Sequence, residues 1–418
     1  MQITEPVSHL GVEDRWRALA LIAAAQIGAM STWFSAAAVA PALSREWHLA
    51  PPAVALLTVA VQVGFVAGAL VIAVCGISDV LSSRSVFTFS ALIAAAANGL
   101  LTTAGGDLRV AVPLRFSLGF ALAGVYPTGM KLMAGWFREG RGLAIGILVG
   151  ALTLGTAFPH LVAGLGATGA LHWQVVFIAT SLGAVVSAAI VAWFVRSGPF
   201  EAPSARLDLT WAVRSLRDPA LRLANLGYFG HMWELYAMWT WLPVFLLASF
   251  QASGLPGDPA PGRPASIAAA GVIGVGALGC VAGGLIADRI GRTLTTVAAM
   301  VVSGACAAVT GFLFASPPVV IIAVTAVWGT SVIADSAQFS ASISELAEPR
   351  RVGSALALQT ALGFLLTAIS IQVLPWILKA AGWSGAFAVL AVGPALGAAA
   401  MLRLRCRPEA ARLAGGRR

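Results

Sequence analysis

The chain has 418 residues, of which 59% are hydrophobic and only 10% are charged, and its mean hydropathy is +0.87. Soluble globular domains carry about 25% charged residues, so this composition excludes a water-soluble enzyme. The net charge of +9 does not indicate nucleic-acid binding, because the basic residues are scattered among short polar breaks rather than gathered on one soluble face. The composition predicts an all-α membrane protein whose partner is the lipid bilayer.

Apolar runs recur along the whole chain, each roughly 20 residues long, the length at which a helix crosses a hydrocarbon core of about 30 Å. About twelve such runs fit, and we expect twelve transmembrane helices. The predicted spans are 16–42, 53–76, 86–105, 111–134, 142–166, 172–195, 221–247, 266–287, 293–315, 318–343, 354–378 and 383–402.

The first apolar run, from Trp16 to about Ala42, is too long for the core of a signal peptide, and the residues before it are polar and acidic. It is therefore predicted to be a retained first span. Most of the 26 basic residues fall in alternate polar breaks. Because basic loops stay in the cytoplasm, both termini are predicted to be cytoplasmic, in a membrane of the bacterial inner (plasma) type.

The chain divides into two halves at its longest predicted cytoplasmic break, which follows the sixth span. Glu139–Ala144, before the fifth span, has a counterpart in Glu348–Ser354, before the eleventh. Two pseudo-symmetric six-helix bundles suit a transporter, because rocking one against the other exposes a midplane site to each side in turn. The predicted division is an N-terminal bundle at 1–196, a linker at 197–219, a C-terminal bundle at 220–404 and a basic cytoplasmic tail at 405–418.

The segment between the eighth and ninth spans reads GLIADRIGR. Its glycines permit a tight turn, and its charged residues can form charge-assisted hydrogen bonds at helix ends. The pattern GxxxDRxGR resembles the loop signature of the major facilitator superfamily. That resemblance implies a gating role for Gly284, Asp288, Arg289, Gly291 and Arg292. An ordinary basic loop with a turn is the alternative.

The equivalent loop between the second and third spans departs from this signature. It keeps Asp79 and Arg84 but lacks the glycines and the DR pair. The resemblance to the superfamily's loop signature implies a gating role for both residues as well.

Spans four and five add further resemblances. Arg115, followed by Gly119, is similar to the family's RxxxG pattern, in which the arginine takes part in proton coupling or substrate binding. Snorkelling of Arg115 to the predicted outer interface is the alternative. The stretch that begins at Tyr126 and includes the span-five glycines looks like the anion-porter and nitrate/nitrite-porter branches, although it has GxxxGxxxxG in place of the nitrate signature GxxxGxG. It also resembles, more loosely, the glycine-and-proline motif of drug:proton antiporters.

Span seven places a carboxylate and an imidazole on one helical stripe, at His231 and Glu234. Glu234 lies roughly 20 Å along the span. An acid in a mostly desolvated cavity can bind and release a proton as access alternates, so Glu234 is predicted to couple transport to protons, with His231 sharing or relaying the proton. The alternative is a neutral Glu234 hydrogen-bonded to His231 as interhelical glue.

Span ten carries a second titratable candidate, Asp335, on a stripe that runs from Trp328 to Ser342. Pairing of Asp335 with a loop arginine is the alternative. The predicted substrate-binding residues are Gln26, Trp33, Gln62, Tyr126, His160, Asn225, Tyr228, Trp239, Trp328 and Gln338. Packing and backbone hydrogen bonds explain each of them equally simply, and tryptophans near span ends are typical interface anchors.

No phosphate-binding loop of the GxxxxGK[ST] type occurs, which disfavours ATP-driven transport. The four cysteines show no CxxC spacing, so no metal or disulfide framework is predicted, and no cofactor. We expect a monomeric, proton-coupled secondary transporter of a small organic solute that works by alternating access and is not an enzyme. An organic anion such as a carboxylate is favoured as substrate. The alternatives are a drug or cation:proton antiporter and, from another class, a channel or non-transporting receptor of the same fold.

Overall fold

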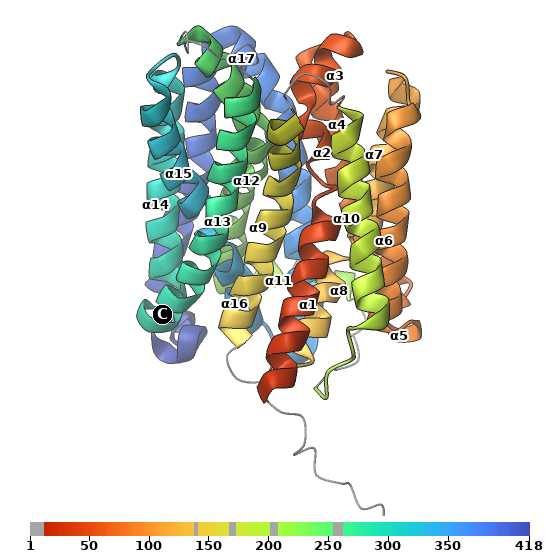
Figure 1. Cartoon of the computed structure of the whole chain (residues 1–418). Coiled ribbons are helices and arrows are strands. Elements are labelled where there is room, and N and C mark those ends of the chain that lie inside the picture. The colour runs from red at the N-terminus through yellow and green to blue at the C-terminus, as the bar shows by residue number, and fades with distance from the viewer. Residues whose placement is uncertain (1–11, 138–140, 167–172, 201–207, 254–261) are drawn as a thin grey trace, which may run out of the picture.

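The computed structural model describes residues 12–137, 141–166, 173–200, 208–253 and 262–418. Within these ranges every regular element is helical, and the long helices run along one common axis (Figure 1). The described chain begins at the lower end of α1 in Figure 1, and the C-terminus lies at the same end. We call this the terminal end of the molecule, and the other the opposite end.

The helices of the first half are α1 (Val12–Met30), α2 (Ser35–Ala38), α3 (Ala40–Glu46), α4 (Pro51–Val74), α5 (Ile77–Val80), α6 (Ser83–Leu100), α7 (Leu108–Leu122), α8 (Tyr126–Ala134), α9 (Arg141–Gly166) and α10 (Gln174–Trp193). Those of the second half are α11 (Leu209–Ser215), α12 (Pro219–Ala252), α13 (Gly262–Ile290), α14 (Arg292–Thr310), α15 (Pro318–Ala334), α16 (Ser336–Leu346) and α17 (Val352–Arg405). Short 3₁₀ turns supplement them, including one at Pro408–Gly416.

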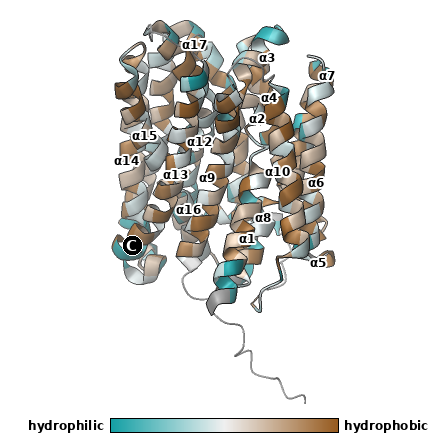
Figure 2. Cartoon of the chain, viewed as in Figure 1, coloured by the Kyte–Doolittle hydropathy of each residue, from teal (hydrophilic) through white to brown (hydrophobic). Residues whose placement is uncertain are grey.

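Ten of the described helices are long and apolar enough to cross a membrane. One of them, α17, consists of two helices joined at Gly382, where φ is +65°, and α1 supplies another crossing helix with a charged beginning. Counting α17 as two helices and adding α1 gives twelve helical segments in the described chain, at the positions of the twelve spans expected from the sequence. Apolar residues cover the helices along most of their length, whereas hydrophilic residues gather at places such as α3 and the beginning of α1 (Figure 2).

The first span differs from the prediction of one continuous helix over 16–42. It breaks after Met30 and resumes as α2 at Ser35. Near the break, the hydroxyls of Ser31 and Thr32 donate to backbone carbonyls one turn earlier, at 2.6 and 2.8 Å. Such local side-chain bonds compete with the helical ladder, so a run that stays apolar in sequence bends at this point.

Close approaches between helices recur six spans apart. A Cβ atom on Gly64 of α4 would lie 2.1 Å from the carbonyl oxygen of Phe116 on α7, and one on Gly279 of α13 would lie 2.1 Å from that of Thr330 on α15. Only glycine permits either contact. The second and fourth spans thus pack as the eighth and tenth do, which is the pseudo-symmetry of a two-bundle fold.

Two helix pairs join the halves. Helix α9 packs along α13, and α4 packs against α17. On the first of these seams, Gly146 and Gly150 of α9 face the carbonyl oxygens of Cys280 and Ala277, with 3.2 and 3.3 Å between each oxygen and the position of an added Cβ. At these two points of the α9–α13 seam the halves meet through glycines and backbone, a contact that can part and re-form without interdigitated side chains.

Candidate functional site

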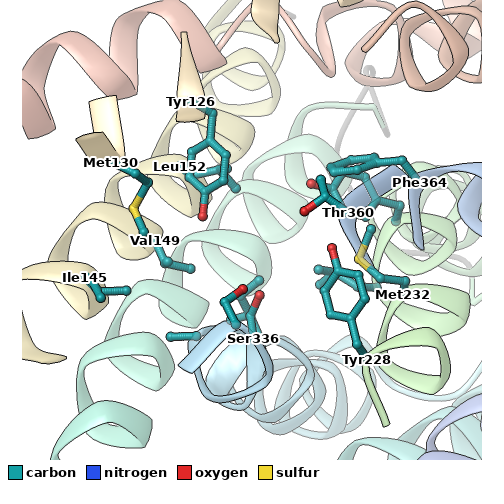
Figure 3. A pocket seen from close by; sticks show the side chains of 15 residues that line it. Tyr126, Met130, Ile145, Val149, Leu152, Tyr228, Met232, Ser336, Thr360 and Phe364 are labelled. Carbon is teal, nitrogen blue, oxygen red and sulfur yellow. The ribbon is translucent and has the colours of Figure 1, made fainter. Parts of the chain in front are cut away.

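A cavity of about 80 Å³ lies where the two halves face one another (Figure 3). The first half contributes Tyr126 and Met130 of α8 and Ile145, Val149 and Leu152 of α9. The second half contributes Tyr228, Met232, Leu235 and Tyr236 of α12, Ile333 of α15, Ser336, Ala337 and Ser340 of α16, and Thr360 and Phe364 of α17. Pockets for organic ligands usually measure about 300–1,000 Å³, so this central pocket must widen to admit such a molecule.

The lining of the central pocket is apolar with hydroxyl groups and carries no acidic or basic side chain. Figure 3 shows the side chains of Tyr126, Tyr228, Ser336 and Thr360 around the same space, with the two tyrosine rings on facing sides. Hydroxyls both donate and accept hydrogen bonds, so this lining can hold a neutral polar group without a counter-charge.

An aromatic cluster lies beside the pocket, and two of its rings, Tyr236 and Phe364, line it. The indole of Trp33, in the break of the first span, lies 5.0 Å from the ring of Phe65, 5.8 Å from Tyr236 and 5.5 Å from Phe364 between centroids. Phe65 and Phe364 are 4.6 Å apart. Because Trp33 and Phe65 belong to the first half and the other two rings to the second, the cluster joins the halves across the molecular axis.

Glu234 lies inside the second half rather than in the central pocket. Its side chain is 1% exposed. One carboxylate oxygen accepts a hydrogen bond of 2.7 Å from the Trp328 indole, and the other accepts one of 2.9 Å from the Ser303 hydroxyl. The expectation that this carboxyl faces a cavity between the halves is therefore wrong, because α12 turns Tyr228 and Met232 toward the pocket and Glu234 toward α14 and α15.

His231 contacts Asp335 and not Glu234. The ring Nδ1 lies 2.9 Å from the Asp335 Oδ1, and both side chains are buried. Asp335 sits at the junction of α15 and α16, inside the single crossing segment Pro318–Leu346. The two alternatives, a direct His231–Glu234 hydrogen bond and a loop arginine for Asp335, also fail, because Asp335 pairs with His231 and the Glu234 carboxylate is held by an indole and a hydroxyl.

The His231–Asp335 pair borders the pocket. Ser336, the residue after Asp335, lines it, and so does Tyr228, one helical turn before His231. Among the described residues, no group of three or more His, Cys, Asp or Glu side chains is arranged to hold a metal ion.

Arg115 is completely buried in the first half, which rules out snorkelling. Its Nε donates to the Leu57 carbonyl at 3.0 Å, and its terminal nitrogens donate to the carbonyls of Thr32 and Trp33 at 3.3 and 2.5 Å. They also donate to Ser35 Oγ at 2.9 Å and, more weakly, to Asn98 Oδ1 at 3.4 Å. The guanidinium thus satisfies carbonyls that the break after α1 leaves without helical partners, at the end of α1 where the helix dipole favours a cation.

The GxxxDRxGR loop connects three parts of the second half. Arg292 donates to Glu345 Oε1 at 2.9 Å and to Gln338 Oε1 at 2.8 Å, both on α16. Its contact with Asp288 is longer, at 3.5 Å. Gly291 takes φ +96°, which favours glycine, and the Arg417 side chain donates to the Asp288 carbonyl.

The same loop touches the first half. A Cβ on Gly142, in the first turn of α9, would lie 3.2 Å from Asp288 Oδ2, and one on Gly284 would lie 3.6 Å from the Gly142 carbonyl. A carboxylate beside the start of a helix is favoured by the exposed N–H groups there. Arg289 is exposed.

In the matching loop of the first half, Arg84 donates to the Ala192 carbonyl of α10 at 2.6 Å. The side chain of Asp79 lies outside the described residues.

Of the predicted substrate contacts, Tyr126 and Tyr228 line the central pocket and Trp33 belongs to the aromatic cluster beside it. Trp239 extends that cluster, with its ring 5.3 Å from Tyr236. The remaining predicted residues, none of which lines the pocket, are Gln26, Gln62, His160, Asn225, Trp328 and Gln338.

These remaining side chains have other surroundings. Asn225 donates to the Leu221 carbonyl of its own helix at 2.8 Å. The amide oxygen of Gln26 lies beside Gly129, 2.7 Å from the position of an added Cβ. Gln62 and His160 are buried, and their polar side-chain atoms have no hydrogen-bond partner within the described residues.

Three hydroxyl residues, Thr360, Ser336 and Ser340, line the pocket without having been predicted from the sequence. Nothing distinguishes them in sequence from the many hydroxyl residues that bond to their own helix. Met232 and Tyr236 were recoverable, since they share a helical face with Tyr228.

The comparison with protein families agrees with this architecture. The family model described as Major Facilitator Superfamily matches residues 21–370. A search of curated proteins finds no match to the chain. A match over most of the chain, together with an all-helical described fold in which ten helices are long and apolar enough to cross a membrane, shows that the chain belongs to the major facilitator superfamily and is a multi-pass membrane protein of the transporter type.

Proposed function

We propose that this protein is a proton-coupled secondary transporter that binds a small neutral organic solute in the central pocket. The observation that carries the proposal is the lining itself: hydroxyls of Tyr126, Tyr228, Ser336 and Thr360 among aromatic, aliphatic and thioether groups, without a fixed charge. A carboxylate or a cation buried there would lack a counter-charge, which is costly. The lining thus favours a neutral solute over the organic anion preferred from the sequence.

The proposed orientation puts the terminal end in the cytoplasm of a cell with an inner (plasma) membrane. Exposed arginines occur in the elements at this end: Arg222 in the first turn of α12, Arg403 in the last turn of α17 and Arg412 in the 3₁₀ turn Pro408–Gly416. An excess of basic residues marks the cytoplasmic side. The aromatic cluster then closes the pocket on the outer side.

The proposed coupling runs through the His231–Asp335 contact. In the proposal, protonation of Asp335 weakens its attraction to His231 and frees the junction between α15 and α16 to move. Because Ser336 follows Asp335 directly and lines the pocket, that movement changes the shape of the solute site. Glu234 is the second proton site, with its charge stabilised by the donors Trp328 and Ser303.

A second candidate is efflux of apolar drugs in exchange for protons. Met130 and Met232 on facing walls of the pocket favour it, since thioether side chains adapt to ligands of varied shape. A channel of the same fold would not require the titratable groups.

The substrate class is tested by thermal unfolding of the purified protein in the presence of neutral, anionic and cationic organic compounds. A ligand that binds only the folded state raises the melting temperature. Neutral compounds are expected to give the largest increases, and the increase should shrink in Tyr228→Phe. Stabilisation by carboxylates alone, or by cations alone, would contradict a neutral substrate.

Coupling is tested in proteoliposomes with an imposed pH difference, using the ligand found in the thermal screen. Asp335→Asn and Glu234→Gln are expected to retain counterflow exchange and to lose pH-driven accumulation. Glu348→Gln, an exposed carboxylate outside the helices, is the matched control and should behave as the wild type. Full pH-driven accumulation in both core variants would overturn the coupling proposal, and simple equilibration by the wild type would indicate a channel.

A further inference from the structure

A second hollow, away from the central pocket, lies along α12 and both helices of α17. Its volume is about 500 Å³. It is lined by Leu223, Leu226, Phe229, Gly230, Trp233, Leu366, Val392, Gly393, Leu396, Ala399, Ala400 and Arg403. We call it the α12–α17 groove.

The floor of the α12–α17 groove is kept open by small residues. A Cβ on Gly230 would lie 2.3 Å from the carbonyl oxygen of Gly393, so the two helices approach closely there and neither position can carry a larger side chain. One wall is fixed, because the Trp233 indole donates to the Val389 carbonyl at 3.0 Å. The hollow is therefore a built feature of the helix packing.

The chemistry of the groove is polarised along its length. All of its lining side chains are apolar or absent except one, Arg403, which is at the terminal end. Arg403 is exposed and makes no hydrogen bond or ion pair within the described part of the chain. A second exposed arginine, Arg222, precedes the lining residue Leu223 on α12.

The length of the groove matches one leaflet of a bilayer. The stretch of α17 from Val392 to Arg403 is roughly 16 Å long at 1.5 Å per residue. Half of a hydrocarbon core of about 30 Å is close to that length. The apolar part of the groove thus reaches from the level of the headgroups to the middle of the membrane, with Arg403 at headgroup level.

We propose that the α12–α17 groove binds one acidic phospholipid of the leaflet at the terminal end. An acyl chain lies along Leu226, Phe229 and Leu396, and the headgroup phosphate accepts hydrogen bonds from the Arg403 guanidinium. Arg222 supplies a second positive charge for an acidic headgroup. A guanidinium is suited to this role because its planar donors match a phosphate, and basic residues between transmembrane helices favour anionic lipids.

The experiment is native mass spectrometry of the full-length protein extracted from vesicles that contain equal amounts of phosphatidylglycerol and phosphatidylcholine. The wild type is expected to retain one phosphatidylglycerol in preference to phosphatidylcholine. Arg403→Gln should lower that retention about fivefold, the effect of one basic residue at an anionic surface. Leu396→Trp, which fills the groove and leaves the charge in place, should also remove the bound lipid.

The matched control is Arg412→Gln, which removes an exposed arginine from the same end but outside the groove. It should leave lipid retention unchanged. Equal retention of the two lipids by the wild type, or equal losses in Arg403→Gln and Arg412→Gln, would overturn the proposal by showing non-specific adhesion. If the wild type carries no lipid and Leu396→Trp keeps an adduct of phosphate mass, the ligand is inorganic phosphate. That result also overturns the lipid proposal. Variants are compared only where their melting temperatures match that of the wild type. A variant that fails to fold is replaced by Arg403→Met or Leu396→Phe.

Discussion

The two halves of the molecule hold their least exposed charged side chains in different ways. In the first half, Arg115 and Arg84 donate chiefly to backbone carbonyls. In the second half, Glu234, Asp335 and Arg292 are held by other side chains, such as Trp328, His231 and Glu345.

This contrast separates a framework from a mechanism. A backbone carbonyl cannot titrate and moves only with its helix, so an arginine bonded to carbonyls fixes a structure. A side-chain partner can change rotamer or protonation state, so a carboxylate held by an indole, a hydroxyl or an imidazole can exchange partners during a transport cycle. The first half therefore has the character of a support, and the second half that of a moving, titratable part.

The largest expected effect comes from Arg115→Leu. It leaves the carbonyls of Leu57, Thr32 and Trp33 buried without their donor. Leaving a buried hydrogen-bonding group unsatisfied costs about 1–3 kcal/mol, and several acceptors lose Arg115 together, so the free energy of unfolding should fall by about 3 kcal/mol or more. Thermal unfolding of the purified protein measures it, with exposed Arg109→Leu on the same helix as the control. If the Arg115→Leu protein were fully stable and lost only proton coupling, Arg115 would belong to the mechanism and the first half would not be only a support.

The next effect concerns the contact between His231 and Asp335. A double-mutant cycle of His231→Gln and Asp335→Asn should give a coupling energy of about 0.5–3 kcal/mol in the free energy of unfolding, since residues in contact are non-additive. His231→Gln combined with Glu234→Gln should be closer to additive, because these two side chains have different partners. The opposite order of couplings would restore the His231–Glu234 pair that the sequence suggested.

A smaller effect is expected from the pocket hydroxyls. Tyr126→Phe and Tyr228→Phe each remove one hydrogen-bonding group and keep the ring. A neutral hydrogen bond contributes about 0.5–1.5 kcal/mol, so the KM for a neutral solute should rise roughly two- to tenfold with little change in stability. Ser384→Ala, at the opposite end and outside the pocket, is the control. An unchanged KM in both tyrosine variants would show that the solute does not bind in this pocket.

The smallest change in stability is expected at the loops, because Arg84 and Arg292 are partly exposed and water screens part of their charge. Arg84→Gln and Arg292→Gln should each alter the free energy of unfolding by about 1 kcal/mol or less. Only Arg292→Gln should also change the transport rate, because it connects the loop to α16, which lines the pocket. If both variants changed the transport rate equally, the two loops would not differ in the way that the rest of the two halves does.

The crossing helices were predictable because a membrane helix requires only a long apolar run. The break after Met30 was not, since hydroxyl residues of the same types as Ser31 and Thr32 also occur inside continuous helices, as do Pro113 and Pro159. Helical spacing placed His231 and Glu234 correctly on α12 and in the interior.

The hydrogen-bond partners of these residues could not be predicted from the sequence. Ser303 and Trp328 lie on α14 and α15, and their approach to Glu234 depends on how three helices are rotated about their axes. Tyr126 and Tyr228 were identified as candidates, but the same polar criterion also selected Asn225 and Gln338, whose hydrogen bonds are used within the protein.

Opening the molecule toward the opposite end requires the four rings of Trp33, Phe65, Tyr236 and Phe364 to separate, which costs free energy. An aromatic side chain buries about 150–250 Å², and exposing half of that area on four rings costs on the order of 10 kcal/mol at about 25 cal/mol per Å². An empty transporter would therefore rest closed on that side, and a solute with apolar faces of its own would lower the barrier by replacing ring contacts as they part. The same ring contacts then account for solute selectivity and for the barrier to leakage of water and ions, because water and ions cannot replace the apolar contacts between the rings.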